Sequence, residues 1–430
     1  MKVCVYAICK NESQFVERWM ASMGEADAVV VLDTGSTDDT VERLRAAGAR
    51  VTVERFDPWR FDTARNRSLD LVPEDADICV CTDLDEVLHP GWRALLEAAW
   101  VPGTTRATYR YTWNFLPDGR EGHVFWYSKV HARHGYRWTH PVHEVLTPDP
   151  GLVERVVTVQ GMQLDHHADE SKSRAQYLPL LELSVQEDPE DDRNMHYLGR
   201  EYMFRGQWEK AIVTLKRHLS LPRATWRDER CASMRFLARC CQAMGQEGEA
   251  ESWLWRAAGE APYLREPWVE LAALLYQKKD MEGTAYCAGR ALAITERPRT
   301  YITEGSAWGS QPADLRSLGL YYTGRKEEAL TYAKRAGLDP ARVYETIRTG
   351  AARSGQLDII APKVLNGDFS AAFYLRHFVK DMGIASQECR DRGLELEVLE
   401  QVLADCRQIE AEGHGGEGTQ ALIRHYPWAD

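Results

Sequence analysis

Ile78-Cys79-Val80-Cys81-Thr82-Asp83-Leu84-Asp85-Glu86 is the stretch that decides the fold of the N-terminal part of the chain. Its apolar run ends in three carboxylates, as expected of a buried strand that reaches the edge of a sheet. Side chains alternate along an extended backbone, so Asp83 and Asp85 point to the same side. Two such carboxylates repel each other unless donors or a cation lie between them. A divalent metal that carries substrate phosphates is one solution, and a solvated acidic turn is the alternative.

The residues around this stretch predict alternating strands and helices. Strands are expected at 3–8, 28–32, 51–53 and 77–82, and helices at 15–23, 40–47 and 64–71. This alternation predicts an α/β domain with a mostly parallel sheet and helices on both faces. Ligands of such sheets bind beyond the carboxyl ends of the strands. Asn11, Asp33 and Asp83 each follow a strand end, so we expect them to converge on one crevice.

Four motifs stand in a characteristic order: Lys10-Asn11-Glu12, then Asp33-Thr34-Gly35-Ser36, then Ala64-Arg65-Asn66, then Asp83-Leu84-Asp85-Glu86. In this order the chain resembles the family-2 glycosyltransferases of GT-A fold. The resemblance implies a Rossmann-like nucleotide-diphospho-sugar transferase domain over residues 1–170. Members of the family use nucleotide sugars and mostly invert the anomeric centre.

The resemblance also implies a nucleoside site. Asp33 matches the acid that contacts the base, and Asn11 and Glu12 match the loop beside the nucleoside. Arg65 and Asn66 match a pair that lines the nucleotide. The structural alternatives are a turn acid for Asp33 and surface helix positions for Arg65 and Asn66.

The diphosphate is expected beside the acidic pair. The resemblance assigns Asp83 to the carboxylate near the ribose and Asp85 to the metal ligand under the diphosphate. A late histidine completes the metal site in many members, and His166 lines up with it better than His167 does. Imidazole with carboxylate suits Mn²⁺ and similar ions, whereas surface histidines are the other interpretation. Bound Mn²⁺ or Mg²⁺ would stabilise the leaving nucleoside diphosphate as a Lewis acid, and Glu86 receives no role.

Residues 105–165 are expected to face the acceptor. Aromatic residues from Tyr109 to Phe115 alternate with polar ones, which predicts a strand with one aromatic face. That face is more often core than a sugar-stacking platform. Related transferases with helical repeats have a Pro-x-His-Glu segment similar to the one that ends at Glu144. An inverting transferase needs a general base, so we predict Glu144 as the base and His143 as its neighbour that orients or binds. A structural salt bridge for Glu144 is an equal alternative.

The sequence pattern of residues 171–430 predicts helices throughout. Gly199, Ala238 and Ala272 fall at tetratricopeptide positions, with separations of 39 and 34 residues against a repeat period of about 34. A shorter copy is expected from Leu318 to Pro340. We therefore predict an all-α tetratricopeptide-like domain over 171–345, followed by capping helices and a C-terminal tail with His425, Tyr426 and Trp428 over 346–430. Such solenoids present concave surfaces, which favours a large acceptor or a homo-oligomer.

Composition limits the classes of function. The net charge of −12 opposes nonspecific nucleic-acid binding. The ten scattered cysteines and the lack of a long apolar run predict a cytoplasmic protein without a membrane segment.

Together these features predict a metal-dependent glycosyltransferase that moves a sugar, with a UDP-sugar donor favoured, to a peptide, protein or other large acceptor. The resemblance is closest to bacterial two-domain enzymes, including those that glycosylate bacteriocin peptides. Three alternatives remain: transfer to hydroxymethylated bases of phage DNA, transfer to a cell-surface polysaccharide, and an inactive repeat scaffold.

Overall fold

The computed structural model describes residues 1–116, 119–169, 175–339, 341, 344, 355–394 and 396–425. The chain forms two compact units, Met1–Ala261 with Arg297–Gly305, and Pro262–Glu296 with Ser306–Asp430. The sequence also predicts a hairpin-type turn at Pro117-Asp118-Gly119, and its first two residues lie outside the described residues. The predicted domain boundaries at 170/171 and 345/346 and the tail residues Tyr426 and Trp428 lie outside them as well.

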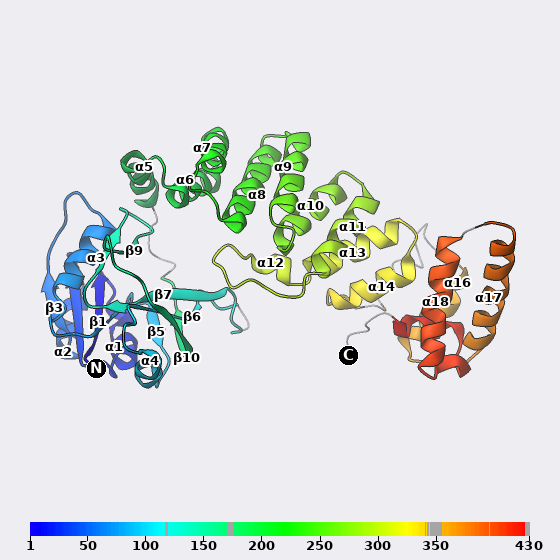
Figure 1. The fold of residues 1–430 in the computed structure, drawn as a ribbon, viewed down its shortest axis with the longest axis horizontal. Helices are drawn as coiled ribbons and strands as arrows, with labels where there is room; N and C mark the ends of the chain where they lie inside the picture. Colours follow the sequence, from blue (N-terminus) through cyan, green and yellow to red (C-terminus); the bar gives the residue numbers. More distant parts are fainter. Residues whose placement is uncertain are drawn as a thin grey trace. The chain divides into compact units, whose positions relative to one another are not determined.

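An eight-stranded sheet in the order β3-β2-β1-β4-β7-β6-β10-β5 lies in the first unit (Figure 1). Strands β1 to β4 pair in parallel, β7 is antiparallel to both β4 and β6, and β10 is parallel to β6 and antiparallel to β5. The expected α/β domain is therefore confirmed, with a parallel first half and a mixed second half. The strands are β1 (Val3–Cys9), β2 (Ala28–Asp33), β3 (Arg50–Val53), β4 (Ile78–Cys81), β5 (Glu86–Leu88), β6 (Arg106–Thr112), β7 (Val124–Ala132) and β10 (Val156–His166).

Both faces of the sheet are covered. All seven residues of β1 are buried, as expected of a central strand between two packed layers. On one face Val3 and Val5 share a core with the helices α1 (Val16–Ser22), α2 (Thr40–Ala46) and α4 (Trp92–Ala99). On the other face Cys4 and Tyr6 pack against residues that follow or belong to α3 (Phe61–Asp70), β8 (Tyr136–Thr139) and β9 (Val145–Pro148). A short 3-10 turn, η1 (Ser13–Phe15), precedes α1.

Five helices complete the first unit: α5 (Tyr177–Glu187), α6 (Asp192–Phe204), α7 (Trp208–Ser220), α8 (Arg227–Ala243) and α9 (Glu247–Glu260). Small residues lie where these helices touch. A Cβ atom on Gly199 would come within 2.6 Å of the Leu215 side chain on α7, and Ala238 is fully buried. The helical character of this part is confirmed, whereas its assignment to tetratricopeptide repeats stays a prediction.

The described part of the second unit is helical. Residues of α17 (Leu375–Asp391), α18 (Glu397–Ala411) and η3 (Thr419–His425) form a core of their own, which includes Leu375, Leu403, Ile409 and Ala421. The elements from α10 onward are α10 (Arg265–Gln277), α11 (Met281–Leu292), α12 (Gly305–Trp308), α13 (Gln311–Tyr322), α14 (Lys326–Arg335), α16 (Gly355–Leu365), α17 (Leu375–Asp391), α18 (Glu397–Ala411), η2 (His414–Gly416) and η3 (Thr419–His425).

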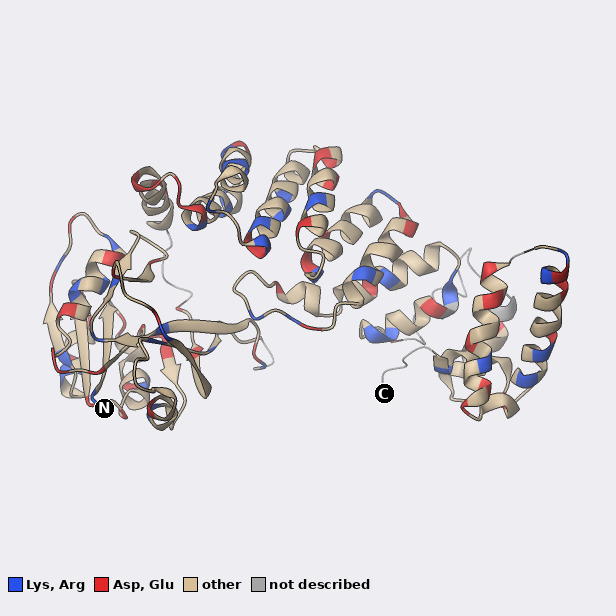
Figure 2. Ribbon diagram, in the orientation of Figure 1, with Lys and Arg blue, Asp and Glu red and all other residues tan. Residues whose placement is uncertain are grey.

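Charged residues, helix hydropathy and cysteine pairing describe the chain beyond its packing. Basic and acidic residues are interspersed along the helices of both units (Figure 2). No described helix is both long and apolar enough to span a bilayer. All ten cysteines lie among the described residues, none of them forms a disulfide bond there, and nine of them are buried.

The contact between α6 and α7 yields a stability prediction. Gly199→Val is expected to destabilise the first unit by about 1–3 kcal/mol, because its side chain would overlap Leu215, which is fully buried. Gly259→Ala on α9 is the control. A Cβ there meets nothing within 4 Å, and the change is expected to stabilise by about 0.5–1 kcal/mol. Urea denaturation followed by circular dichroism measures both. Parent-like stability of Gly199→Val would contradict the close packing.

Candidate active site

Two buried cations hold the acidic stretch that follows β4. Arg65 on α3 donates from Nη2 to Oδ1 of Asp83 and, over 2.9 Å, from Nε to Oε1 of Glu144. Lys129 on β7 donates from Nζ to Oδ2 of Asp83 over 2.9 Å and to Oε1 of Glu86 over 3.1 Å. The side chains of Arg65 and Lys129 are only 5% and 8% exposed. Asp83 therefore bridges two cations that come from different layers of the domain.

Burial and pairing act in opposite directions on the ionisation of these groups. Burial opposes the charged form of Asp83, but Arg65 and Lys129 face its two oxygens and lower its pKa. Burial likewise opposes the charge on each cation, and the carboxylates outweigh it, so the pKa values of Arg65 and Lys129 are raised. Asp83 and both cations are therefore ionised at neutral pH.

Glu86 gives the acidic turn its shape. It is 1% exposed, and its Oε2 accepts the backbone N–H of Asp83 over 2.9 Å. Its Oε1 accepts the Tyr111 hydroxyl over 2.8 Å in addition to Lys129. Burial, with help from Asp83 and Asp85, raises the pKa of Glu86 despite the nearby Lys129. The carboxylate that received no role from the sequence thus ties the backbone at Asp83 to strands β6 and β7.

Asp85 faces His166 because of strand register. Strand β5 pairs antiparallel with β10 so that Glu86 lies opposite His166, and the Asp85 Oδ2 to His166 Nε2 distance is 3.5 Å. His166 Nδ1 donates to the Trp113 carbonyl over 2.8 Å, which fixes the ring and leaves Nε2 toward Asp85. Burial lowers the pKa of His166, but Asp85 outweighs it and the pKa is raised.

This pair is a candidate metal site. Among the described residues no group of three or more possible metal-ligating side chains gathers. One carboxylate and one imidazole fit Mn²⁺, with coordination positions left for diphosphate oxygens and water. His167 contributes its backbone N–H to the Asp85 carbonyl over 2.8 Å, while its ring stacks on Phe115 at 5.4 Å. The register therefore turns His166, rather than His167, toward the carboxylate.

The loops expected at the nucleoside are tied to each other. Oδ1 of the buried Asp33 accepts the backbone N–H of Ser36 over 2.9 Å, and Ser36 Oγ donates to Oδ2. Asn11 has a φ of 53°, and its Oδ1 accepts the backbone N–H of Thr37 over 2.7 Å. Glu12 is 5% exposed. The contacts of Asp33 are those of a turn acid, and its role toward a base stays a prediction.

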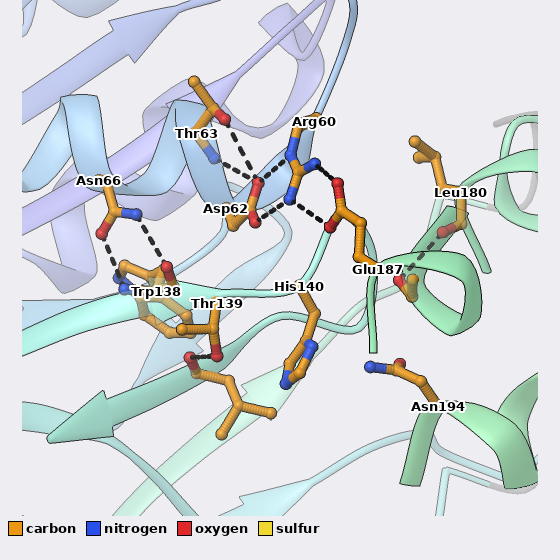
Figure 3. Close-up of polar contacts among 12 residues, drawn as sticks. Arg60, Asp62, Thr63, Asn66, Trp138, Thr139, His140, Leu180, Glu187 and Asn194 are labelled. Atoms are coloured by element: carbon orange, nitrogen blue, oxygen red, sulfur yellow. Dashed lines mark hydrogen bonds and ion pairs between the residues drawn. The ribbon is translucent and has the colours of Figure 1, made fainter. Parts of the chain in front are cut away.

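Arg65 and Asn66, the predicted nucleotide pair, have different partners. Nδ2 of Asn66 donates to the Trp138 carbonyl over 2.8 Å, and Oδ1 accepts the Trp138 N–H over 2.7 Å (Figure 3). The Asn66 amide therefore anchors strand β8. It also lines an open cavity of about 400 Å³ together with Asp62, His140 and Glu187. The acidic turn is not part of that lining, so we do not place the donor there.

The aromatic strand divides between core and surface. Tyr109 and Tyr111 are at most 1% exposed, whereas Trp113 is 44% exposed. The Trp113 ring centroid lies 4.7 Å from that of His166. The core interpretation therefore holds for the two tyrosines, and Trp113 is an exposed ring beside the candidate metal ligand.

Lys129 and Glu86 were not expected from the sequence. Lys129 is the single lysine or arginine of β7, Val124–Ala132. A lone cation in a largely apolar strand needs a buried anion, and that signal could have pointed to it. The anion itself could not be chosen, because Asp83 is 46 residues away.

An α/β sheet with acidic residues at the carboxyl edge of its parallel strands is typical of nucleotide-binding domains. Residues 4–149 match the family model of glycosyl transferase family 2. Residues 325–426 match a model described as NAD-binding of NADP-dependent 3-hydroxyisobutyrate dehydrogenase. The chain is therefore similar to glycosyl transferase family 2 in its N-terminal part and to a dehydrogenase domain in its C-terminal part.

The matches to curated relatives extend over about as many residues as the dehydrogenase-like match at 325–426. The uncharacterized oxidoreductase YkwC of Bacillus subtilis is 40% identical over 97 residues, 23% of this chain and 34% of that protein. A probable 3-hydroxyisobutyrate dehydrogenase-like 1 protein of Arabidopsis thaliana is 44% identical over 96 residues, 22% of this chain and 29% of that protein. The chain spans about a third of the length of these relatives.

The dehydrogenase-like match overlaps two segments with other predicted assignments. It begins within the predicted fourth repeat, Leu318–Pro340, and covers most of the predicted capping helices. Residues 325–426 thus resemble a dehydrogenase domain rather than the end of a repeat array, which the spacing of small residues did not reveal.

The solved structures that resemble this chain have low TM-scores. Glucosyl-3-phosphoglycerate synthase from Mycobacterium tuberculosis, in complex with Mn²⁺, UDP and glucosyl-3-phosphoglycerate, has a TM-score of 0.23 and 29% identity over 26% of this chain and 44% of that chain. MamA has a TM-score of 0.31 and 15% identity over 39% of this chain and 89% of that chain. Neither likeness carries an assignment of function.

The buried ion cluster yields a second prediction. Lys129→Met is expected to destabilise the first unit by about 3–5 kcal/mol, because Asp83 and Glu86 lose their shared cation. The double variant Lys129→Met/Glu86→Gln removes one charge of each sign and should recover part of that loss. The control, Lys10→Met at an exposed position, should stay within about 0.5 kcal/mol. Urea denaturation gives each value, and a Lys129→Met loss equal to that of the control would refute the pairing.

Proposed function

We propose that the N-terminal domain transfers a sugar from a nucleoside diphosphate sugar to a large acceptor with the help of a divalent metal. The observation that carries the proposal is the acidic turn at the end of β4, held by Arg65 and Lys129, with Asp85 facing His166. The match of residues 4–149 to glycosyl transferase family 2 supports the same reaction class. Family habit favours a UDP-sugar donor, and the helical part favours a peptide or protein acceptor.

In this proposal the loops after the parallel strands bind the donor. Asn11, Glu12 and Asp33 face the nucleoside, and Asp83 lies near the ribose with Arg65 fixing its carboxylate. Asp85 and His166 would hold Mn²⁺ or Mg²⁺, which supplies Lewis-acid stabilisation of the leaving diphosphate. Asn66 contributes indirectly, since its amide is bonded to the β8 backbone.

Glu144 is the proposed general base. Its side chain is 14% exposed, and Arg65 holds its Oε1. We propose that Oε2 of Glu144 takes the proton from the acceptor. The deprotonated acceptor then attacks the anomeric carbon from the side opposite the diphosphate, which leaves as its bond to the sugar breaks, and the configuration of that carbon is inverted. Trp113, exposed beside His166, offers a ring face on which a sugar can stack.

The metal site gives the test of this proposal. Asp85→Ala and His166→Ala are expected to lower the Mn²⁺-dependent hydrolysis of a UDP-sugar by about 10²–10³-fold, since the leaving group loses its charge stabilisation. His167→Ala is the matched control and should keep the parent rate. Release of UDP measures turnover. Parent-like hydrolysis by Asp85→Ala would refute the metal site, and loss only in His167→Ala would exchange the two histidines.

Dinucleotide binding by residues 325–426 is a second candidate function. It is favoured by the match to an NAD-binding dehydrogenase model and by the 40% and 44% identities to segments of oxidoreductases. Calorimetric titration of the full chain with NAD⁺ and NADP⁺ tests it. A dissociation constant below about 1 mM, equivalent to about 4 kcal/mol of binding free energy, is expected, and no measurable binding at that concentration would dismiss the candidate.

A further inference from the structure

The loop that carries Glu144 contains two strained residues. His140 and His143 have φ values of 78° and 52°, a left-handed conformation that non-glycine residues adopt at a cost in free energy. They flank Pro141 and Val142 at the tip between β8 and β9, and Glu144 follows directly. Such backbone persists only where the surrounding contacts impose it.

The N-terminal part of α6 supplies those contacts. Nη1 of Arg193 donates to the His143 carbonyl over 2.6 Å, and the His143 ring stacks on Tyr197 with centroids 4.2 Å apart and planes at 17°. Asp191, at the N-cap of α6, lies 3.2 Å from Nδ1 of His140. The two strained histidines are thus held by different residues at this end of α6, His140 by Asp191 and His143 by Arg193 and Tyr197.

Further contacts fix this end of α6 in place. The Arg193 guanidinium lies 4.9 Å from the Tyr197 ring, and Arg200 lies 4.4 Å from the same ring. Val142 is 2% exposed and shares a core with α6, α7 and α8 residues. Arg60, just before α3, bridges Asp62 and Glu187, which joins the α/β domain to α5 as well (Figure 3).

We propose that Arg193 is a positioning residue for glycosyl transfer, which with Asp191 and Tyr197 holds the 140–144 loop so that Glu144 meets Arg65. The proposal rests on the proposed function and on Glu144 as its base. It predicts that the two parts of the site depend on different elements. The α/β domain forms the donor site, whereas the alignment of the base depends on a residue 50 positions further along the chain. If Arg193 served only to pack the helix, its replacement would leave turnover unchanged as long as the chain stayed folded.

The test uses the full-length chain, Mn²⁺ and a UDP-sugar. Arg193→Gln is expected to lower kcat for donor hydrolysis about 10–100-fold, because a small displacement of the base is costly, with UDP affinity unchanged. Arg193→Lys, which keeps a donor and a charge, should recover part of kcat. Arg205→Gln is the matched control, since Arg205 lies at the opposite end of α6, at its C-cap, and donates to Glu201, and it should retain the parent kcat.

A double-variant cycle separates positioning from general stability. Glu144→Gln alone should lose more than Arg193→Gln, and the double variant should lose no more than Glu144→Gln, since both act through one carboxylate. Additive losses, an unchanged kcat in Arg193→Gln, or an equal loss of UDP affinity would each overturn the proposal. A parent chain that neither binds UDP nor hydrolyses any UDP-sugar would instead overturn the proposed function and this inference with it.

Discussion

The ion pairs of Arg65 are the constraint on which the candidate site depends. One buried guanidinium holds both Asp83, at the end of β4, and Glu144, in the loop between β8 and β9. A buried cation without partners is far more costly than a paired one, so neither carboxylate can leave without destabilising the domain. Lys129 adds the same constraint from β7 by joining Asp83 to Glu86. The donor and acceptor halves of the proposed reaction are thereby linked through a single side chain.

The sheet determines which residues can share this cluster. Parallel pairing of β2, β1 and β4 brings the residues after each strand to one edge, and antiparallel pairing of β5 with β10 adds His166 beside Asp85. A shift of that pairing by one residue would turn the side chains of β10 to the opposite face. The choice between the two adjacent histidines is therefore made by register, and not by the imidazoles themselves.

Local sequence patterns predicted much of this arrangement, but they did not predict contacts between residues that are distant in sequence. The apolar run 78–81 and the residues after each strand end indicated the sheet and the position of Asp83 and Asp85. Lys129 was missed and the Trp138 contact of Asn66 was not foreseen, because their partners lie 46 and 72 residues away and no periodicity indicates such pairs. In the same way, small residues at helix contacts predicted helices correctly but did not distinguish repeats from the dehydrogenase-like segment.

The folding unit that contains the site is larger than the α/β domain. Helices α5 to α9 and residues Arg297–Gly305 belong to the same compact unit as the sheet. Tyr301 connects the three parts: its ring stacks near Tyr197, its hydroxyl donates to Glu229 on α8 over 2.6 Å, and it packs against the sheet core. The strained loop before Glu144 is held by Arg193 and Tyr197 of α6, and the Phe61 N–H of α3 adds a bond to the Pro141 carbonyl over 3.0 Å. Helices α5 to α9 therefore belong to the same packed unit as the candidate site, and α6 supports the loop that carries Glu144.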